Sequence, residues 1–105
     1  LKETVLGEYF NEAISGEEVV HGKPAPDIFK AAAKRLQVQP AASIVLEDSL
    51  AGLQAGRAAG SFVIALATTL PFSELQKSSE YYDLLYRSPS ELKLEKVLRY
   101  FENNF

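Results

Sequence analysis

Two adjacent carboxylates and one lysine are the residues of this sequence best suited to chemistry. Glu47 and Asp48 come directly after an apolar run at residues 43–46, and acids at such a place are costly unless they are solvated, paired or bound to a cation. Mg²⁺ prefers oxygen ligands and usually keeps several waters, so one or two protein carboxylates suffice. Lys23 lies between a glycine and a Pro-x-Pro turn, where a stiff backbone holds its ammonium as a point charge for a phosphoryl group.

The segments that would position these residues alternate between apolar runs and helical patterns. Residues 43–46 and 62–66 are continuous apolar runs, which are typical of strands buried on both faces. Residues 12–15 form a shorter candidate strand, and residues 81–86 form a fourth near the end. Strands that alternate with helices of this length predict an α/β domain with a parallel sheet.

The order of these segments predicts where the candidate residues lie. Ligands of open parallel sheets bind at the carboxyl ends of the strands. Glu47 and Asp48 come at the end of the 43–46 strand, and Lys23 lies in the loop at residues 16–26, which follows the first candidate strand. We therefore expect all three residues at one edge of the sheet.

Three helices are predicted from periodicity and end signals. Pro26 and Asp27 suit the start of an amphipathic helix after the lysine loop. Ser49 is a plausible N-cap for a second helix that runs to about Ala59. Residues 88–91 form a capping box with proline at the first position of a third helix. That third helix is expected to bury one stripe of side chains, made by Leu94, Val97, Leu98 and Phe101.

Glycine recurs at every fourth position in and after the second helix, at Gly52, Gly56 and Gly60. Positions without a side chain leave a smooth face, which we expect to pack closely on the sheet. In a membrane the same spacing would favour helix dimerisation, but this segment is too polar for that role.

Composition excludes several classes of function. The net charge is −3 with acids and bases interspersed, so there is no basic face for nucleic acid and no polybasic segment for anionic lipid. Cysteine is absent and His21 is the single histidine, which excludes disulfides, thiolate sites and a histidine-rich metal site within one chain. The sequence has no apolar run that would span a bilayer. A cytoplasmic domain of 105 residues is expected, although residues 1–6 are typical of the middle of a helix and not of a natural beginning.

Two motifs resemble those of a known superfamily. Residues 21–29 (HGKPAPDIF), followed by residues 45–56 (VLEDSLAGLQAG), resemble motifs three and four of the haloacid dehalogenase (HAD) superfamily, in the branch of β-phosphoglucomutase-like proteins and sugar-phosphate phosphatases. The likeness is detailed from about residue 15 to residue 67. It implies a three-layer Rossmann-like core with a parallel sheet. It also implies Mg²⁺-dependent phosphoryl transfer on small phosphorylated metabolites, through an aspartyl-phosphate.

The resemblance assigns a role to each candidate residue. Lys23 matches the motif-three lysine, a catalytic and phosphate-binding residue that neutralises the nucleophilic carboxylate and the transferring phosphoryl oxygens. Asp48 matches the acid that binds Mg²⁺, and Glu47 matches its neighbour, which supports the metal directly or through water. Alternate residues of a strand face opposite ways, so only one acid needs to bind the metal directly, and we expect it to be Asp48. Ser49 is expected to support these acids without touching the ion.

The sequence also departs from the superfamily pattern. Its aspartates are Asp27, Asp48 and Asp83, so the Asp-x-Asp motif that supplies the nucleophile and the general acid/base is absent. The motif-two Ser or Thr, the first two strands and the cap are absent as well. The chain 1–105 therefore resembles the C-terminal half of the core domain. We expect it to be inactive alone and to need the missing segment or self-association for a stable fold, and its substrate cannot be inferred without the cap.

Other interpretations remain open from the residues alone. Haloacid dehalogenation needs no metal, but it would leave Glu47 and Asp48 idle. A truncated or split chain without catalysis could act through association with a partner or with itself. Glu47 and Asp48 could also be acids that favour the start of a helix, and Lys23 could be a surface lysine in a turn.

Overall fold

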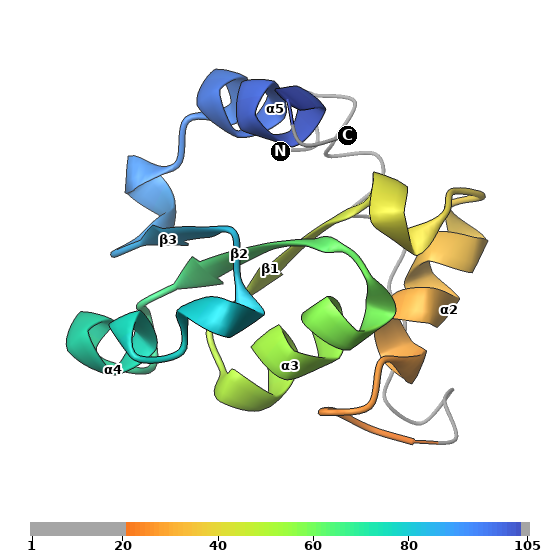
Figure 1. The fold of residues 1–105 in the computed structure, drawn as a ribbon, viewed down its shortest axis with the longest axis horizontal. Helices are drawn as coiled ribbons and strands as arrows, with labels where there is room; N and C mark the ends of the chain where they lie inside the picture. Colours follow the sequence, from red (N-terminus) through yellow and green to blue (C-terminus); the bar gives the residue numbers. More distant parts are fainter. Residues whose placement is uncertain (1–20, 104–105) are drawn as a thin grey trace.

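The computed structural model describes residues 21–103. Three strands form one parallel sheet in the order β1 (Ile44–Glu47), β2 (Phe62–Leu66) and β3 (Leu84–Tyr86) (Figure 1). Val45 pairs with Val63 across the first two strands, and Ile64 pairs with Leu84 across the second two. The predicted parallel α/β sheet is confirmed. The candidate strand at residues 12–15 and the helical start at 1–6 lie outside the described residues.

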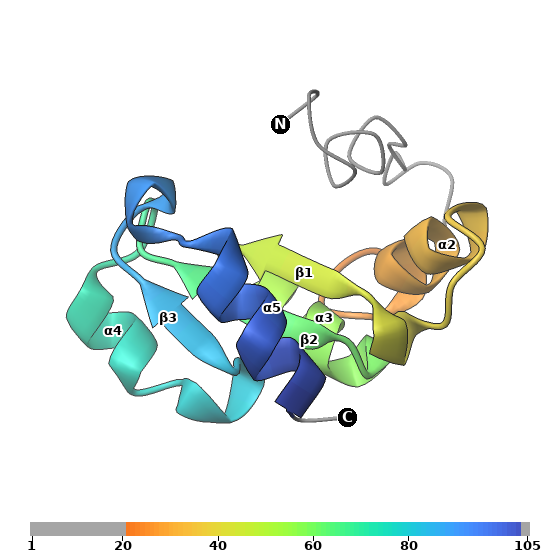
Figure 2. The same ribbon diagram turned by 90° about the horizontal axis from the view of Figure 1, so that it is seen from above.

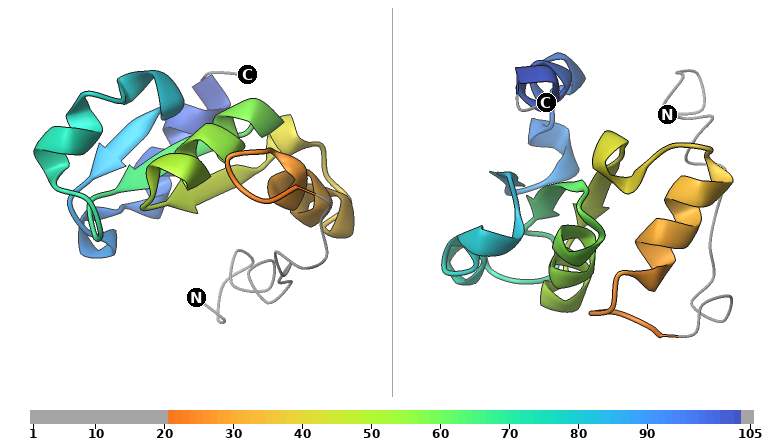
Figure 3. Two further views of the ribbon diagram at one scale, coloured as in Figure 1. Left: turned by 90° about the horizontal axis from the view of Figure 1, so that it is seen from below. Right: turned by 45° about the vertical axis from the view of Figure 1, so that its right-hand side comes forward.

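Helices cover both faces of this sheet. Figures 1 and 2 show α5 (Leu94–Asn103) across one face, with α3 (Leu50–Ala59) and α4 (Phe72–Gln76) on the other. The view from below in Figure 3 brings α3 to the front, with α2 (Asp27–Arg35) beside it. Short 3₁₀ turns connect the larger elements, and they are η2 (Pro40–Ala42), η3 (Ser79–Tyr81) and η4 (Pro89–Glu91).

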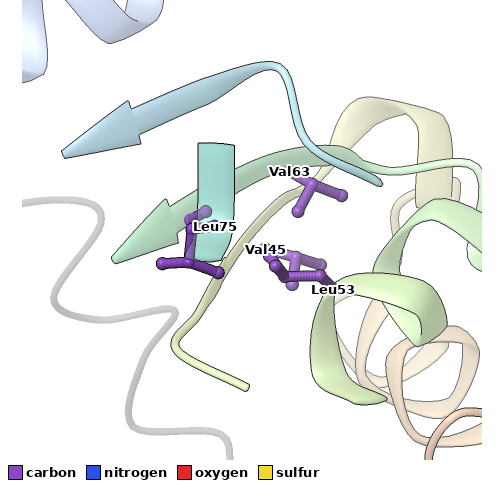
Figure 4. Close-up of a cluster of buried hydrophobic side chains, with 5 residues drawn as sticks. Val45, Leu53, Val63 and Leu75 are labelled. Atoms are coloured by element: carbon purple, nitrogen blue, oxygen red, sulfur yellow. The ribbon is translucent and has the colours of Figure 1, made fainter. Parts of the chain in front are cut away.

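The core consists of two layers, because successive side chains of a strand point to opposite faces of the sheet. Under α3 and α4, Val45 and Val63 pack with Leu53 and Leu75 (Figure 4). On the α5 side, one cluster joins Phe62, Ile64 and Val97. The middle strand β2 is thus buried on both faces, which is the physical reason why its sequence is a continuous apolar run.

Local signals set the ends of α3 as expected. The Ser49 hydroxyl accepts a hydrogen bond from the Gly52 amide at 3.0 Å, so Ser49 is the N-cap. Gly60 ends the helix with φ 84°, and its amide bonds back to carbonyls of the last turn. Gly60 is exposed and does not belong to the smooth packing face, whereas Gly52 and Gly56 are buried. The packing face of α3 therefore includes Gly52 and Gly56 but not Gly60, which we had expected to belong to it.

The predicted start of the last helix is wrong. Residues 89–91 form the separate turn η4, and α5 begins only at Leu94. The Glu91 carboxylate accepts a hydrogen bond from the Arg87 amide at 2.8 Å instead of closing a capping box with Ser88. Leu92 then has extended backbone angles, φ −75° and ψ 121°, which separate the turn from the helix.

The predicted apolar stripe of α5 is only partly correct. Val97 is 2% exposed, but Leu94 and Leu98 are 38% and 37% exposed. The side chain of Phe101 lies outside the described part of the chain. Helix α5 contacts the sheet through Val97, which packs against Phe62 and Ile64, and through Tyr100, whose ring meets that of Phe62 edge to face at 5.6 Å.

No helix between residues 21 and 103 combines the length and the apolar character that a membrane span requires. Helix α4 was not expected from the sequence. It begins after Pro71, and its Leu75 is 1% exposed in the core.

A candidate phosphate and metal site at the carboxyl edge of the sheet

Three segments meet at the carboxyl edge of β1 and β2. Glu47 ends β1 and Asp48 follows it, while Lys23 comes from the loop before α2. Thr68 and Thr69 come shortly after β2. Side-chain contacts join these segments, so Lys23 and the acids lie at the same edge, as the strand order predicts.

Lys23 and Glu47 form an ion pair between Nζ and Oε1. The Lys23 side chain is 33% exposed and that of Glu47 is 11% exposed, so the pair is shielded on the side of the acid and open on the side of the lysine. The Lys23 ammonium also lies 5.3 Å from the centre of the Phe29 ring, a favourable position for a cation. The lysine charge is thus held at the rim of the site.

The lysine loop is closed by Asp27. Its Oδ2 accepts a hydrogen bond from the His21 amide at 3.3 Å and lies 3.4 Å from His21 Nδ1. Ala25 donates its amide to the Gly22 carbonyl at 3.0 Å. Asp27 therefore fixes the loop that carries Lys23, and its carboxylate is directed to His21 and not to the acids after β1.

Glu47 is held against the start of α3. Its Oε2 accepts hydrogen bonds from the Ser49 hydroxyl and the Asp48 amide, both at 3.3 Å. Ser49 thus caps the helix and donates to Glu47 at the same time. The amide groups at a helix N-terminus favour a negative charge, and this position places the Glu47 carboxylate beside them.

Asp48 is held by two hydroxyls that the sequence interpretation missed. Thr69 donates to Asp48 Oδ2 at 2.5 Å, and Thr68 donates to the same oxygen at 3.2 Å. The Thr69 hydrogen bond is the largest cause that lowers the pKa of Asp48 below its usual value. Partial burial acts in the opposite direction, while Thr68, the local backbone and the charge of Lys23 add to the lowering. The sequence did contain one signal for these two threonines: they come shortly after β2, the strand that pairs in parallel with β1.

The donor chemistry of this edge suits part of a magnesium site. Asp48 and Glu47 offer the hard carboxylate oxygens that Mg²⁺ prefers. Within residues 21–103, no group of three or more histidine, cysteine or acidic side chains is arranged to hold a metal ion. The two acids can therefore supply some ligands of an octahedral ion, and water or other groups must supply the rest.

The remaining aspartate within the described residues, Asp83, has a structural role. Its Oδ2 accepts the Val63 amide at 2.8 Å and lies 3.2 Å from Arg57 Nη2. The Asp83 amide donates to the Val63 carbonyl at 2.7 Å. Asp83 thus fastens the start of β3 to β2 and to α3, away from the carboxyl edge.

A family profile described as haloacid dehalogenase-like hydrolase matches residues 1–60 of the chain. The chain belongs to this family. The match includes the lysine loop, both acids and α3, so the expected HAD resemblance is confirmed on the residues that carry it.

Individual HAD relatives agree with this assignment. The chain is 43% identical over 89 residues to a bifunctional riboflavin kinase/FMN phosphatase of Arabidopsis thaliana, covering 85% of this chain and 23% of the relative. It is 47% identical over 55 residues to a fructose-1-phosphate phosphatase of Escherichia coli, covering 52% of this chain and 29% of the relative. The crystal structure of a β-phosphoglucomutase from Clostridium difficile superposes with a TM-score of 0.70 and 28% identity, covering 84% of this chain and 36% of that one.

These relatives confirm the HAD-like core as the fold class of the chain. They also confirm its nearness to phosphatases and phosphomutases. The chain spans less than a third of the length of the two curated relatives. We therefore give the activity, substrate and partners of the whole protein only as proposals.

Proposed function

We propose that this chain is the part of a Mg²⁺-dependent HAD phosphatase or phosphomutase that carries the phosphate-neutralising lysine and a metal-binding acid. The substrate would be a small phosphorylated metabolite such as a sugar phosphate. One observation carries the proposal: Lys23, Glu47 and Asp48 lie together at one edge of the sheet. There Lys23 pairs with Glu47, whereas among the described residues Asp48 has only neutral hydroxyls as its side-chain hydrogen-bond donors.

The different partners of the two acids support a division of roles. Lys23 neutralises the charge of Glu47, and Ser49 and the start of α3 fix its carboxylate. Asp48 receives hydrogen bonds from neutral threonines, so it keeps a full negative charge for a cation. Asp48 is therefore the direct metal ligand, and Glu47 orients Lys23.

Lys23 acts on the phosphoryl group through its charge. Its side chain is partly exposed, so the ammonium can approach phosphoryl oxygens while Glu47 Oε1 holds the same Nζ in position. A bound Mg²⁺ would supply further positive charge to those oxygens. Fixed charges aimed at a transferring phosphoryl group are the main source of catalysis in this kind of reaction.

The nucleophile of this mechanism is an aspartate supplied from outside the 105 residues. Asp27 closes the lysine loop and Asp83 fastens β3, so neither is placed to attack phosphorus. The adjacent acids would have no role in a metal-free dehalogenation, and the relatives named above are phosphatases and a phosphomutase.

A metal-binding measurement tests the proposal on the chain itself. Mn²⁺ replaces Mg²⁺ as the probe, and water-proton relaxation reports the bound fraction whatever the size of the assembly. We expect weak binding in the millimolar range, about −4 kcal/mol. Asp48→Asn should reduce the binding much more than Glu47→Gln. Glu95→Gln removes the same charge from an exposed position on α5 and is the control.

An activity measurement tests the proposal that the nucleophile lies outside these 105 residues. The 105-residue chain should release no phosphate from p-nitrophenyl phosphate with Mg²⁺ present, because it has no placed nucleophile. Turnover of order 1 per second that disappears in Asp48→Ala would refute the proposal that the nucleophile comes from outside the chain. Equal loss of Mn²⁺ binding in Glu47→Gln and Asp48→Asn would refute the assignment of Asp48 as the direct ligand.

A further inference from the structure

The segment after β2 reaches across the sheet edge to the acid after β1. Both threonine hydroxyls donate to Asp48 Oδ2, Thr69 at 2.5 Å and Thr68 at 3.2 Å. A hydrogen bond between a hydroxyl and a carboxylate is charge-assisted, and 2.5 Å lies at the short end of its range. Neither of these two hydroxyls donates to Oδ1.

The threonines can position Asp48 because their own backbone is fixed at both ends. On one side, the Ala67 amide donates to the Tyr86 carbonyl at 2.9 Å and extends the pairing of β2 with β3. On the other side, Leu70 packs on the core cluster under α3 and α4. The next helix is held as well, since the Arg87 guanidinium lies 4.1 Å from the centre of the Phe72 ring.

Neutral donors hold a carboxylate without cancelling its charge. A lysine hydrogen-bonded to Asp48 would compete with a metal ion for the same electrons; Lys23 is paired with Glu47 instead, and the threonine hydroxyls fix the orientation of Asp48 and leave its negative charge in place. Groups that orient the ligands of a metal in this way commonly change its affinity by about 10–100-fold when they are removed.

We infer that Thr69, assisted by Thr68, is the positioning residue of the metal-binding carboxylate of Asp48. By holding Oδ2, the hydroxyls fix the rotamer of Asp48 and direct Oδ1 to the cation. This inference rests on the proposed metal role of Asp48, and it links the loop between β2 and α4 to the site. Any change in that loop is then transmitted to the metal through the Thr69 hydroxyl.

The hydrogen bonds can be observed directly in the metal-free chain. The sequence has three aspartates, Asp27, Asp48 and Asp83, so labelling with ¹³C-aspartate gives few carboxylate bands in the infrared spectrum. Asp48→Asn identifies the band of Asp48. We expect Thr69→Val, which keeps the shape and removes the hydroxyl, to shift that band alone. Thr69→Ser should restore the position of the band, and Thr68→Val should shift it less.

The same variants are then titrated with Mn²⁺. Thr69→Val should bind about tenfold more weakly, Thr69→Ser should bind as the parent chain does, and Ser73→Ala is the control for loss of a hydroxyl outside the site. An unshifted Asp48 band in Thr69→Val, or equal Mn²⁺ affinities of the Val and Ser variants, overturns the inference.

The outcomes separate this inference from the proposed function. A shifted band together with Mn²⁺ binding that is unchanged in Asp48→Asn would overturn the metal role and, with it, the function assigned to Thr69. Binding that is lost in Asp48→Asn but unaffected in Thr69→Val would overturn the positioning role alone. If Thr69→Val does not fold, Thr69→Ser against Thr69→Ala gives the same comparison.

Discussion

The carboxylate of Glu47 lies directly against the backbone of Gly52 in the first turn of α3. A Cβ atom at position 52 would stand 2.2 Å from both Cδ and Oε2 of Glu47. One turn further along the helix, a Cβ atom at Gly56 would stand 3.0 Å from Val63 Cγ2 and 3.1 Å from Val45 Cγ1. Gly52 thus leaves room for the Glu47 carboxylate of the site, and Gly56 leaves room for Val63 and Val45 of the core.

Gly56→Ala should destabilise the fold and Gly52→Ala should change the site. At position 56 the new methyl would press on Val63 and Val45, which are buried on two paired strands, so we expect a loss of about 1–3 kcal/mol. At position 52 the methyl would overlap the Glu47 carboxylate, which must swing away and give up its present partners, whereas alanine favours a helix over glycine by about 0.5–1 kcal/mol. Urea unfolding at one fixed protein concentration measures both.

The Gly52→Ala variant should also lose the contact of Glu47 with Lys23, because the displaced carboxylate can no longer rest on the helix. A structure of this variant, or cross-linking of the Lys23 amine to the carboxylate, reports that contact. A greater loss of stability in Gly52→Ala than in Gly56→Ala would contradict the packing described for α3.

Asp83→Ala should be markedly destabilising. The variant leaves the Val63 amide without its acceptor, and an unmet buried donor costs about 1–3 kcal/mol. Asp83→Asn keeps an acceptor oxygen and loses only the partly exposed pair with Arg57, which we expect to cost less than about 1 kcal/mol. Thermal and urea unfolding measure the two variants, and Glu80→Gln controls for charge. Equal losses in Asp83→Ala and Asp83→Asn would assign the effect to the ion pair.

Tyr82 should make stability fall at high pH. Its phenol packs against the core cluster under α3 and α4, and burial raises its pKa above the usual 10.0. In the unfolded chain the phenol ionises at its usual pKa, and in the folded chain it ionises at a higher pH. The contribution is therefore fully present below pH 10 and is lost as pH rises through the folded-state pKa.

The Tyr82→Phe variant isolates this effect. Free energies of unfolding measured below and above pH 10 should fall less steeply in Tyr82→Phe than in the parent chain. An unchanged pH profile in Tyr82→Phe would show that another group is responsible.

The chain alone should not behave as a native-like monomer. Within the described residues, β1 pairs with β2 along one edge, and no strand pairs with its other edge. Each unmet buried polar group costs about 1–3 kcal/mol, against about 5–15 kcal/mol for the stability of a whole domain. Self-association or a strand from another chain would satisfy that edge, and without either we expect a loose fold.

Size-exclusion chromatography with light scattering over a concentration series, combined with amide hydrogen exchange, tests this expectation. Association should weaken on dilution, and amides at residues 44–46 should then exchange faster. A compact monomer at every concentration, with slow exchange at 44–46, would contradict it.

Strongly local signals explain which features the sequence could predict. The β2 segment is apolar throughout because helices cover both faces of the sheet there, and Ser49 is recognisable as a cap because its hydroxyl bonds only three residues ahead. The expected capping box at residues 88–91 failed because the Glu91 carboxylate had a competing donor, the Arg87 amide. Local patterns cannot rank two nearby donors, since the choice depends on where the preceding strand ends.

By itself, the sequence determined the parallel α/β class, the family and the placement of Lys23, Glu47 and Asp48 at the ends of strands. Apolar runs, caps and motif spacing depend on residues that are close in sequence, so they can be recognised without knowing the fold. Only the tertiary structure decided that Lys23 pairs with Glu47 and that Thr69 holds Asp48, which lies 21 positions away in sequence. Those contacts exist because β1 and β2 are in parallel register, which brings the residues after one strand beside the residues after the other.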